Sequence, residues 1–229
     1  MTTPLTTKAI TVRASGSTEP GLTYVGTAFW EATGCAVHIT FDDKVGEASD
    51  PFDVVVASVD ALNRDFRPKN KVEAGGVRIG SMSLGVPIRA GAEVPDVSSM
   101  GTLMKAIQAA DALILTTHTS GLYFENVLKK AGIFDSIASK IERSPNGPIL
   151  MDRLLRGSGK EFGVLSINQA RRYEGKGITL AGALPLEAQQ IRDFIAVPMA
   201  DSRNKEAAWA FVNFCGGPGK AILNQNGFN

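Results

Sequence analysis

The residues best suited to do chemistry lie in a hydroxyl-rich stretch from Thr116 to Gly121. This stretch follows an aliphatic run and precedes an amphipathic segment from Leu122 to Ala131. The pattern predicts a buried strand that leads through a turn into a helix, with Ser120 as the N-cap. Such a turn presents unpaired backbone N–H groups and hydroxyls at the positive end of a helix dipole, which favours an anion.

A second turn of the same kind is predicted near the start of the chain. The expected strand Ala9–Ala14 leads into Ser15, Gly16, Ser17 and Thr18, and a helix is expected to begin near Pro20. Two such turns, far apart in the sequence, predict that a small anionic ligand is held between two halves of an α/β protein.

Three further side chains each have two interpretations. His118, inside the later turn, is either a structural residue or a group that pairs with a ligand carboxylate or shuttles a proton, since its ordinary pKa of about 6.5 suits both roles. Arg78 is either solvated or forks onto a ligand carboxylate. Tyr123 either packs within its helix or directs its hydroxyl to a ligand.

The bulk composition excludes several classes of function. The chain has 229 residues and a formal net charge of +1, which argues against partners recognised by bulk charge, such as nucleic acid or a membrane surface. No apolar run reaches the length of a membrane span. Residues 1–8 are polar, which predicts a cytoplasmic location for the sequence as it stands and a periplasmic one if a leader is removed ahead of it.

Motifs for common cofactors are absent from the sequence. It has no dinucleotide fingerprint, no phosphate-binding P-loop and no zinc-protease or nucleophile-elbow motif, so no cofactor is expected. Two histidines and two separated cysteines also predict no metal site. Cys35 and Cys215 are expected to be small core residues.

Strand and helix patterns alternate along the chain, which predicts a mostly parallel sheet with helices on both faces. Strands are expected at 9–14, 36–41, 52–57, 77–89, 112–116, 162–166, 178–181 and 194–199. Helices are expected at 20–32, 99–110, 121–130, 148–156, 205–214 and 219–224.

Two extended segments, Val77–Arg89 and Gln189–Pro198, are suited to carry the chain between lobes and to act as hinges. The expected division is residues 1–84 plus 195–229 for the first lobe and 85–194 for the second.

Short motifs in a fixed order from residue 9 to the end of the chain resemble a known family. They are the Ser15 turn, Phe52–Ser58, Gly85–Gly91, Pro95–Ser98, Thr119–Tyr123, Phe162–Ile167, Gly182–Gln189 and Ala207–Phe228. The set is similar to that of type II solute-binding proteins of the molybdate-binding kind. The resemblance implies a two-lobed, periplasmic-binding-protein-like α/β fold, each lobe a mixed sheet flanked by helices, with a ligand cleft between the lobes. It also implies a monomer and, for an exported protein, an ABC-transporter permease as partner.

The resemblance also nominates site residues. Ser15, Gly16 and Ser17 would face Thr119, Ser120, Gly121 and Tyr123 across the ligand, while Ser58 and Asn168 lie at strand ends where α/β ligands bind. The acidic pair Asp42 and Asp43 replaces a serine-rich turn, which weakens the case for molybdate itself.

Two functions stay open at this point. The first is capture of a small oxyanion or a di- or tricarboxylate. The second is isomerisation of a small unsaturated polycarboxylate, since the same branch includes an aconitate isomerase. In that case His118 would move the proton, and Ser15, Ser120 and an arginine would stabilise the developing negative charge.

Overall fold

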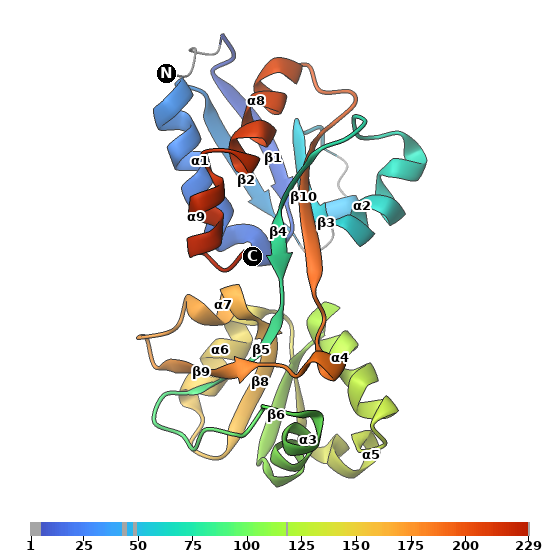
Figure 1. Ribbon diagram of the computed structural model, residues 1–229, viewed down its shortest axis with the longest axis vertical. Coiled ribbons are helices and arrows are strands. Elements are labelled where there is room, and N and C mark those ends of the chain that lie inside the picture. The colour runs from blue at the N-terminus through green and yellow to red at the C-terminus, as the bar shows by residue number, and fades with distance from the viewer. Residues whose placement is uncertain (1–5, 43–44, 48–49, 118, 229) are drawn as a thin grey trace. The chain divides into compact units, whose positions relative to one another are not determined.

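The computed structural model of the protein describes residues 6–42, 45–47, 50–117 and 119–228. The chain divides into two compact units, the first comprising Met1–Met82 and Arg192–Asn229 and the second Ser83–Ile191. It therefore leaves the first unit after Met82 and returns to it at Arg192. Each unit has its own sheet (Figure 1). Buried apolar side chains form a separate core in each unit.

The sheet of the first unit has the strand order β2-β1-β3-β10-β4. Strand β1 (Ala9–Ala14) runs parallel to β2 (Ala36–Phe41) and to β3 (Val54–Ser58). Strand β10 (Arg192–Pro198) is antiparallel to both β3 and β4 (Val77–Met82). The carboxyl ends of β1, β3 and β4 and the amino end of β10 therefore meet at one edge of this sheet.

Helices cover both faces of the first sheet. On one face α1 (Glu19–Thr33), α8 (Lys205–Gly216) and α9 (Lys220–Gln225) form the larger core, where the ring of Phe29 meets that of Phe211 edge to face at 5.3 Å. The side chains of β3 that point the other way pack with α2 (Val59–Asp65) in a smaller cluster.

A buried carboxylate fastens this sheet to the segment ahead of α8. The Oδ2 atom of Asp53 accepts hydrogen bonds from the backbone N–H of Thr11 at 2.8 Å and from its hydroxyl at 3.1 Å. Its Oδ1 atom accepts from the Ser202 hydroxyl at 2.7 Å and from the Asn204 amide at 3.2 Å. The buried charge is stable because four donors replace the water that it lost.

The sheet of the second unit has the strand order β7-β6-β8-β5-β9. Strand β6 (Ala112–Thr116) runs parallel to β7 (Ile141–Ser144) and to β8 (Glu161–Ser166). Strand β5 (Leu84–Arg89) is antiparallel to β8 and to β9 (Ile178–Ala183). The carboxyl ends of β6, β7 and β8 thus share an edge with the amino end of β5, which is the point where the chain enters this unit.

Helices also cover both faces of the second sheet. One face packs against α3 (Met100–Ala109), α4 (Thr119–Lys130) and α5 (Phe134–Ile137). The other packs against α6 (Gly147–Arg156) and α7 (Ile167–Arg171). Successive residues of β6 alternate between the two cores, as a strand buried on both faces requires.

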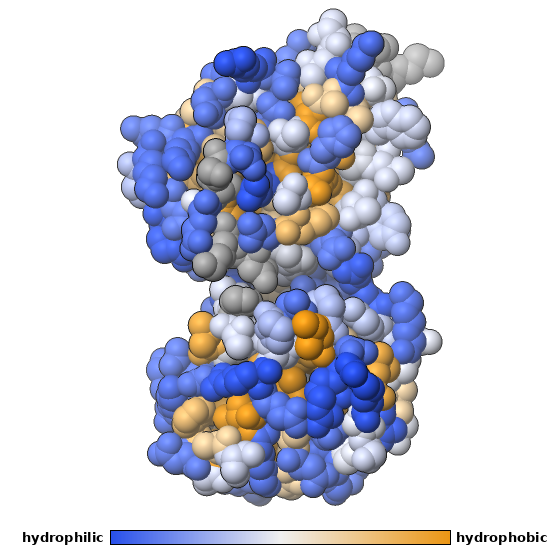
Figure 2. Space-filling view, turned by 180° about the vertical axis from the view of Figure 1, so that it is seen from behind, coloured by the Kyte–Doolittle hydropathy of each residue, from blue (hydrophilic) through white to orange (hydrophobic). Residues whose placement is uncertain are grey.

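Polar and charged residues cover most of the visible face of each unit, and apolar side chains show there in separate patches (Figure 2). Among the described helices, none is both long and apolar enough to cross a membrane.

The structure corrects several expectations drawn from the sequence pattern. The mostly parallel sheet is wrong, because β5 and β10 run antiparallel to their neighbours and make both sheets mixed. The expected strand Val77–Arg89 is two strands, β4 and β5, which belong to different units. The pattern also missed β7, α2, α5 and α7, each only four to seven residues long. Such short elements contain too few residues to show a periodicity.

Candidate functional site

The early turn is held together by its threonine. Ser15 continues the sheet, since its N–H donates to the carbonyl of Val56 at 2.9 Å. Thr18 is fully buried and donates to the Ser15 carbonyl twice, from its N–H at 2.8 Å and from its hydroxyl at 2.7 Å. A short 3-10 turn, Gly16–Thr18, follows, and α1 begins directly after it. The Ser15 hydroxyl makes no capping hydrogen bond to the short 3-10 turn and is part-exposed.

Ser58 lies at the same edge of the first sheet as this turn. It is the last residue of β3, and β3 is the neighbour of β1 in the sheet. Its side-chain oxygen accepts the N–H of Ala61 at 3.2 Å and so caps α2. A hydroxyl that accepts one bond can still donate another. The structure therefore brings Ser15, Gly16, Ser17 and Ser58 to one edge, where the hydroxyls of Ser15 and Ser58 can act as donors.

Arg78 has a partner within its own unit. Its Nε and Nη2 atoms donate to Asp193 Oδ1 at 2.9 and 2.7 Å, and the Ser81 hydroxyl donates to the same oxygen at 2.8 Å. These bonds, first from Ser81 and then from Arg78, hold the pKa of Asp193 below its usual range. The Arg78 guanidinium, for which a ligand carboxylate was one of two predicted surroundings, joins β4 to β10 in this structure.

The later turn is also held by a buried threonine. The hydroxyl oxygen of Thr116, at the end of β6, accepts the N–H of Gly121 at 3.2 Å and lies 3.2 Å from the Ser120 hydroxyl. Helix α4 begins at Thr119, so Ser120 stands inside the first turn and the prediction that it is the N-cap is wrong. The sequence analysis included Thr116 in the hydroxyl-rich stretch, but it did not predict that the Thr116 hydroxyl accepts the N–H of Gly121, five positions further along the chain.

Gly121 is required by the close approach of α4 to β6. A Cβ atom at this position would overlap the carbonyl oxygen of Thr116 and lie 2.6 Å from its backbone nitrogen. Any side chain would therefore push the helix off the strand. Thr119 is exposed and Ser120 part-exposed, which leaves both beside the amino end of α4. That end carries the positive pole of the helix dipole.

The remaining predicted residues of the second unit have mixed surroundings. Tyr123 packs its ring against the main core, and its hydroxyl donates to the carbonyl of Gln189 at 2.7 Å. Asn168 is buried, in α7 directly after β8, at the edge that also holds the end of β6. His118 lies outside the described residues, so its role stays a prediction.

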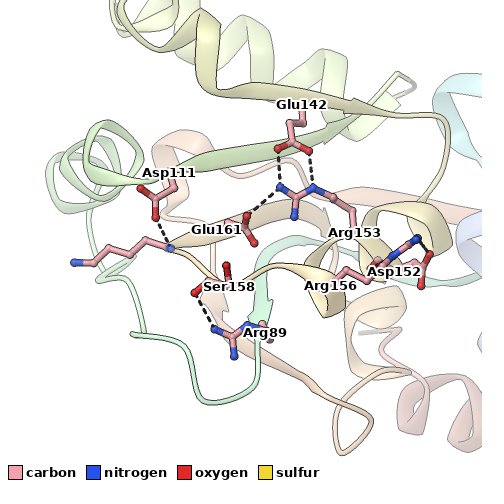
Figure 3. Close-up of polar contacts among 9 residues, drawn as sticks. Arg89, Asp111, Glu142, Asp152, Arg153, Arg156, Ser158 and Glu161 are labelled. Atoms are coloured by element: carbon pink, nitrogen blue, oxygen red, sulfur yellow. Dashed lines mark hydrogen bonds and ion pairs between the residues drawn. The ribbon is translucent and has the colours of Figure 1, made fainter.

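The second unit also holds a separate cluster of charged side chains that could attract an anion (Figure 3). It borders a hollow of about 590 Å³ lined by Arg143, Arg153 and Arg156, among others. Arg153 donates two 2.7 Å bonds to Glu142 and a 3.0 Å bond to Glu161, which raises its pKa. Each of the other two arginines also pairs with a carboxylate of this unit. These cations are already neutralised, so the cluster is a poor anion site.

No group of three or more metal-ligating side chains occurs among the residues that the structure describes. The sequence profile of bacterial extracellular solute-binding proteins matches residues 10–229. The chain belongs to that family. Its members are normally periplasmic components of ABC transporters.

Solved structures show the same architecture. The periplasmic molybdate-binding protein of Azotobacter vinelandii superimposes with a TM-score of 0.76 and 16% identity, covering 96% of this chain and 98% of the other. The substrate-binding domain of a putative molybdenum ABC transporter from Clostridium difficile gives 0.73 and 13%, with the same coverage. The sulfate-binding protein SubI of Mycobacterium tuberculosis gives 0.73 and 21%, covering 96% of this chain and 86% of its own. The type II periplasmic-binding-protein fold, with a mixed sheet in each lobe, is confirmed.

One curated relative has a different activity. An aconitate isomerase from a Pseudomonas species is 22% identical over 222 residues, which cover 92% of this chain and 82% of the isomerase.

Proposed function

We propose that this protein captures a small oxyanion or a di- or tricarboxylate, with donors from both units, for delivery to an ABC-transporter permease. The observation that carries the proposal is the repeated design of the two turns. In each, a buried threonine secures the turn and a part-exposed serine lies beside it, Ser15 in the early turn and Ser120 in the later one. Each turn lies at one edge of the sheet of its own unit. The chain leaves or enters that unit at the same edge.

The ligand class follows from the donors. Hydroxyls and backbone N–H groups at the start of a helix favour a negative charge without a neutralising cation. A hydrogen bond to a charged group contributes about 1.5–3 kcal/mol, so several of them support micromolar binding after the costs of ordering. Arg78 is given no ligand contact in this proposal, because its guanidinium is bonded to Asp193.

Calorimetric titration tests the proposal with molybdate, sulfate, citrate and both aconitate isomers as separate probes. Ser15→Ala should weaken binding of the captured anion by about 10- to 150-fold, the loss of one charge-assisted hydrogen bond. Ser120→Ala should fall at the low end of that range, because Thr116 shares its hydroxyl. Ser136→Ala is the matched control, since its exposed hydroxyl bonds to the local carbonyl of Ile133. Equal affinity in the Ser15 and Ser136 variants would remove the proposal.

The isomerase relative favours a second candidate function, isomerisation of a small unsaturated polycarboxylate. In this proposal His118 accepts a proton from the carbon next to a carboxylate and returns it within the same allylic system, so no oxidant is needed. Ser15 and Ser120 would stabilise the charge that develops on the carboxylate oxygens.

Proton NMR of trans-aconitate in deuterated water separates the two functions. An isomerase exchanges the methylene protons and forms the cis isomer, whereas a binding protein does neither. His118→Ala should abolish the exchange and His38→Ala, which changes an exposed residue of β2, should preserve it. If none of the acids that bind exchanges its methylene protons, the isomerase proposal is excluded.

A further inference from the structure

The side chain of Gln189 makes an unusually complete set of hydrogen bonds at the place where the chain crosses between units. Its Oε1 atom accepts the N–H of Leu84 at 2.6 Å and that of Gln190 at 3.0 Å. Its Nε2 atom donates to the carbonyls of Leu84 at 3.0 Å and Leu184 at 3.1 Å. These partners fix the orientation of the amide, because a flipped amide would set N–H against N–H and oxygen against oxygen.

The two ends of this network belong to the two crossings of the chain. Leu84 is the first residue of β5, two positions after the chain leaves the first unit, and Gln189 stands three positions before it returns. The Gln189 side chain engages both backbone groups of Leu84, as a neighbouring strand would. The amide therefore ties the outgoing and returning segments together within the second unit.

The same residue also reaches the α4 turn. The backbone carbonyl of Gln189 accepts the Tyr123 hydroxyl at 2.7 Å, and Tyr123 lies in the first two turns of α4. Figure 1 shows the segment after β9 running beside α4. The hydroxyl of Tyr123 uses its one hydrogen in this bond, so it has none left to donate to an anion.

We infer that Gln189 and Tyr123 are positioning residues that couple the crossing segments to the first turn of α4. This inference rests on the proposed function, in which that turn contributes donors to the bound anion. In this proposal, a change of backbone torsion at either crossing shifts the donors in the first turn of α4. The Gln189 side-chain amide and the Tyr123 hydroxyl transmit the change. Tyr123, which the sequence analysis nominated as a ligand contact, is in this proposal the residue that holds Thr119 and Ser120 in place.

Tyr123→Phe tests the inference with little disturbance, since it removes one oxygen and keeps the packed ring. The affinity for whichever of molybdate, sulfate, citrate or aconitate binds the unmodified protein should fall by about three- to tenfold, the effect of one lost neutral hydrogen bond. Tyr173→Phe is the matched control, because its ring packs in another core of the same unit. Thermal unfolding is measured in parallel. A purely structural bond would lower the melting temperature and leave the dissociation constant unchanged, and that result would overturn the inference.

Hydrogen exchange on the ligand-free protein keeps this test separate from that of the proposed function. Tyr123→Phe and Gln189→Leu should both speed amide exchange over residues 119–125, and Gln189→Leu, which removes the acceptor of the Leu84 N–H, should also speed exchange at Leu84. Suppose no tested anion binds the unmodified protein. The proposed function then fails, while faster exchange at 119–125 still supports the coupling. Unchanged exchange in both variants would overturn the coupling whatever the binding result.

Discussion

Gly121→Ala should destabilise the second unit, whereas Gly101→Ala should not. Both glycines lie in the first turn of a helix of this unit, Gly101 in α3 and Gly121 in α4. A Cβ at Gly101 would have the Ser99 hydroxyl oxygen, 4.0 Å away, as its nearest neighbour. One at Gly121 would overlap the backbone of Thr116. The same chemical change thus meets open space in one helix and a fixed strand in the other.

The size of the difference follows from two opposing terms. Alanine is more favourable than glycine in a helix by about 0.5–1 kcal/mol, so Gly101→Ala should be neutral or stabilising. Overpacking costs about 1–3 kcal/mol, and the upper end applies at Gly121 because Thr116 belongs to a strand paired on both sides. The net loss for Gly121→Ala is about 2 kcal/mol or more, which lowers the melting temperature of a unit this size by roughly 10 °C.

The choice of probe matters for this measurement. Both tryptophans, Trp30 in α1 and Trp209 in α8, belong to the first unit, so their fluorescence reports that unit. Far-UV circular dichroism reports both units. Urea unfolding of Gly121→Ala should therefore show an early transition by circular dichroism that the fluorescence does not follow to the same extent. If Gly121→Ala unfolds at the same urea concentration as Gly101→Ala by circular dichroism, the reasoning about this helix–strand contact is wrong.

Three further predictions concern the first unit. Asp53→Asn should lower the free energy of unfolding of the first unit by about 2–4 kcal/mol, because the new amide NH₂ group must face buried donors. Urea unfolding followed by tryptophan fluorescence measures this loss, and a loss under about 1 kcal/mol would contradict the prediction. Burial raises the pKa of the thiols of Cys35 and Cys215, so neither should react with a thiol reagent until the protein unfolds. Rapid labelling of either cysteine in the native protein would contradict this prediction. The lowered pKa of Asp193 gives stability that is present above its ordinary pKa of about 3.9 and lost as the pH falls through the lowered value. Asp193→Asn should therefore lower the free energy of unfolding by less than about 1 kcal/mol at neutral pH, because the Arg78–Asp193 pair is half-exposed. The difference between the two proteins should vanish in acid. A difference that does not change with pH would show that the ion pair is not its cause.

The sequence located both turns because their signals are local. An apolar run followed by hydroxyl-bearing residues and glycine marks the end of a strand and the start of a helix within about ten residues. The β1 and β6 strands and the α1 and α4 helices were predicted on that basis, and the structure places them within two residues of the expected bounds. Local patterns of this kind need no knowledge of the sheet to be read.

The partners of these residues could not be predicted in the same way. The bond from Arg78 to Asp193 joins residues 115 positions apart, and the Gln189 side chain reaches back 105 positions to Leu84. Both depend on which strands are neighbours and in which direction they run, and the alternation of elements misjudged those directions. The acceptor of the Tyr123 hydroxyl is a backbone carbonyl, which leaves no signature in the residue type.

The two turns divide their work between threonine and serine, and this division makes the proposed site testable. Thr18 and Thr116 are buried and their hydroxyls bond to the backbone of their own turns, so substituting them tests stability. Ser15 and Ser120 are part-exposed, and the backbone of neither turn depends on their hydroxyls. A part-exposed hydroxyl that bonds to no backbone group of its turn can be removed at little cost to stability. Affinity lost on replacing these serines can therefore be attributed to the ligand.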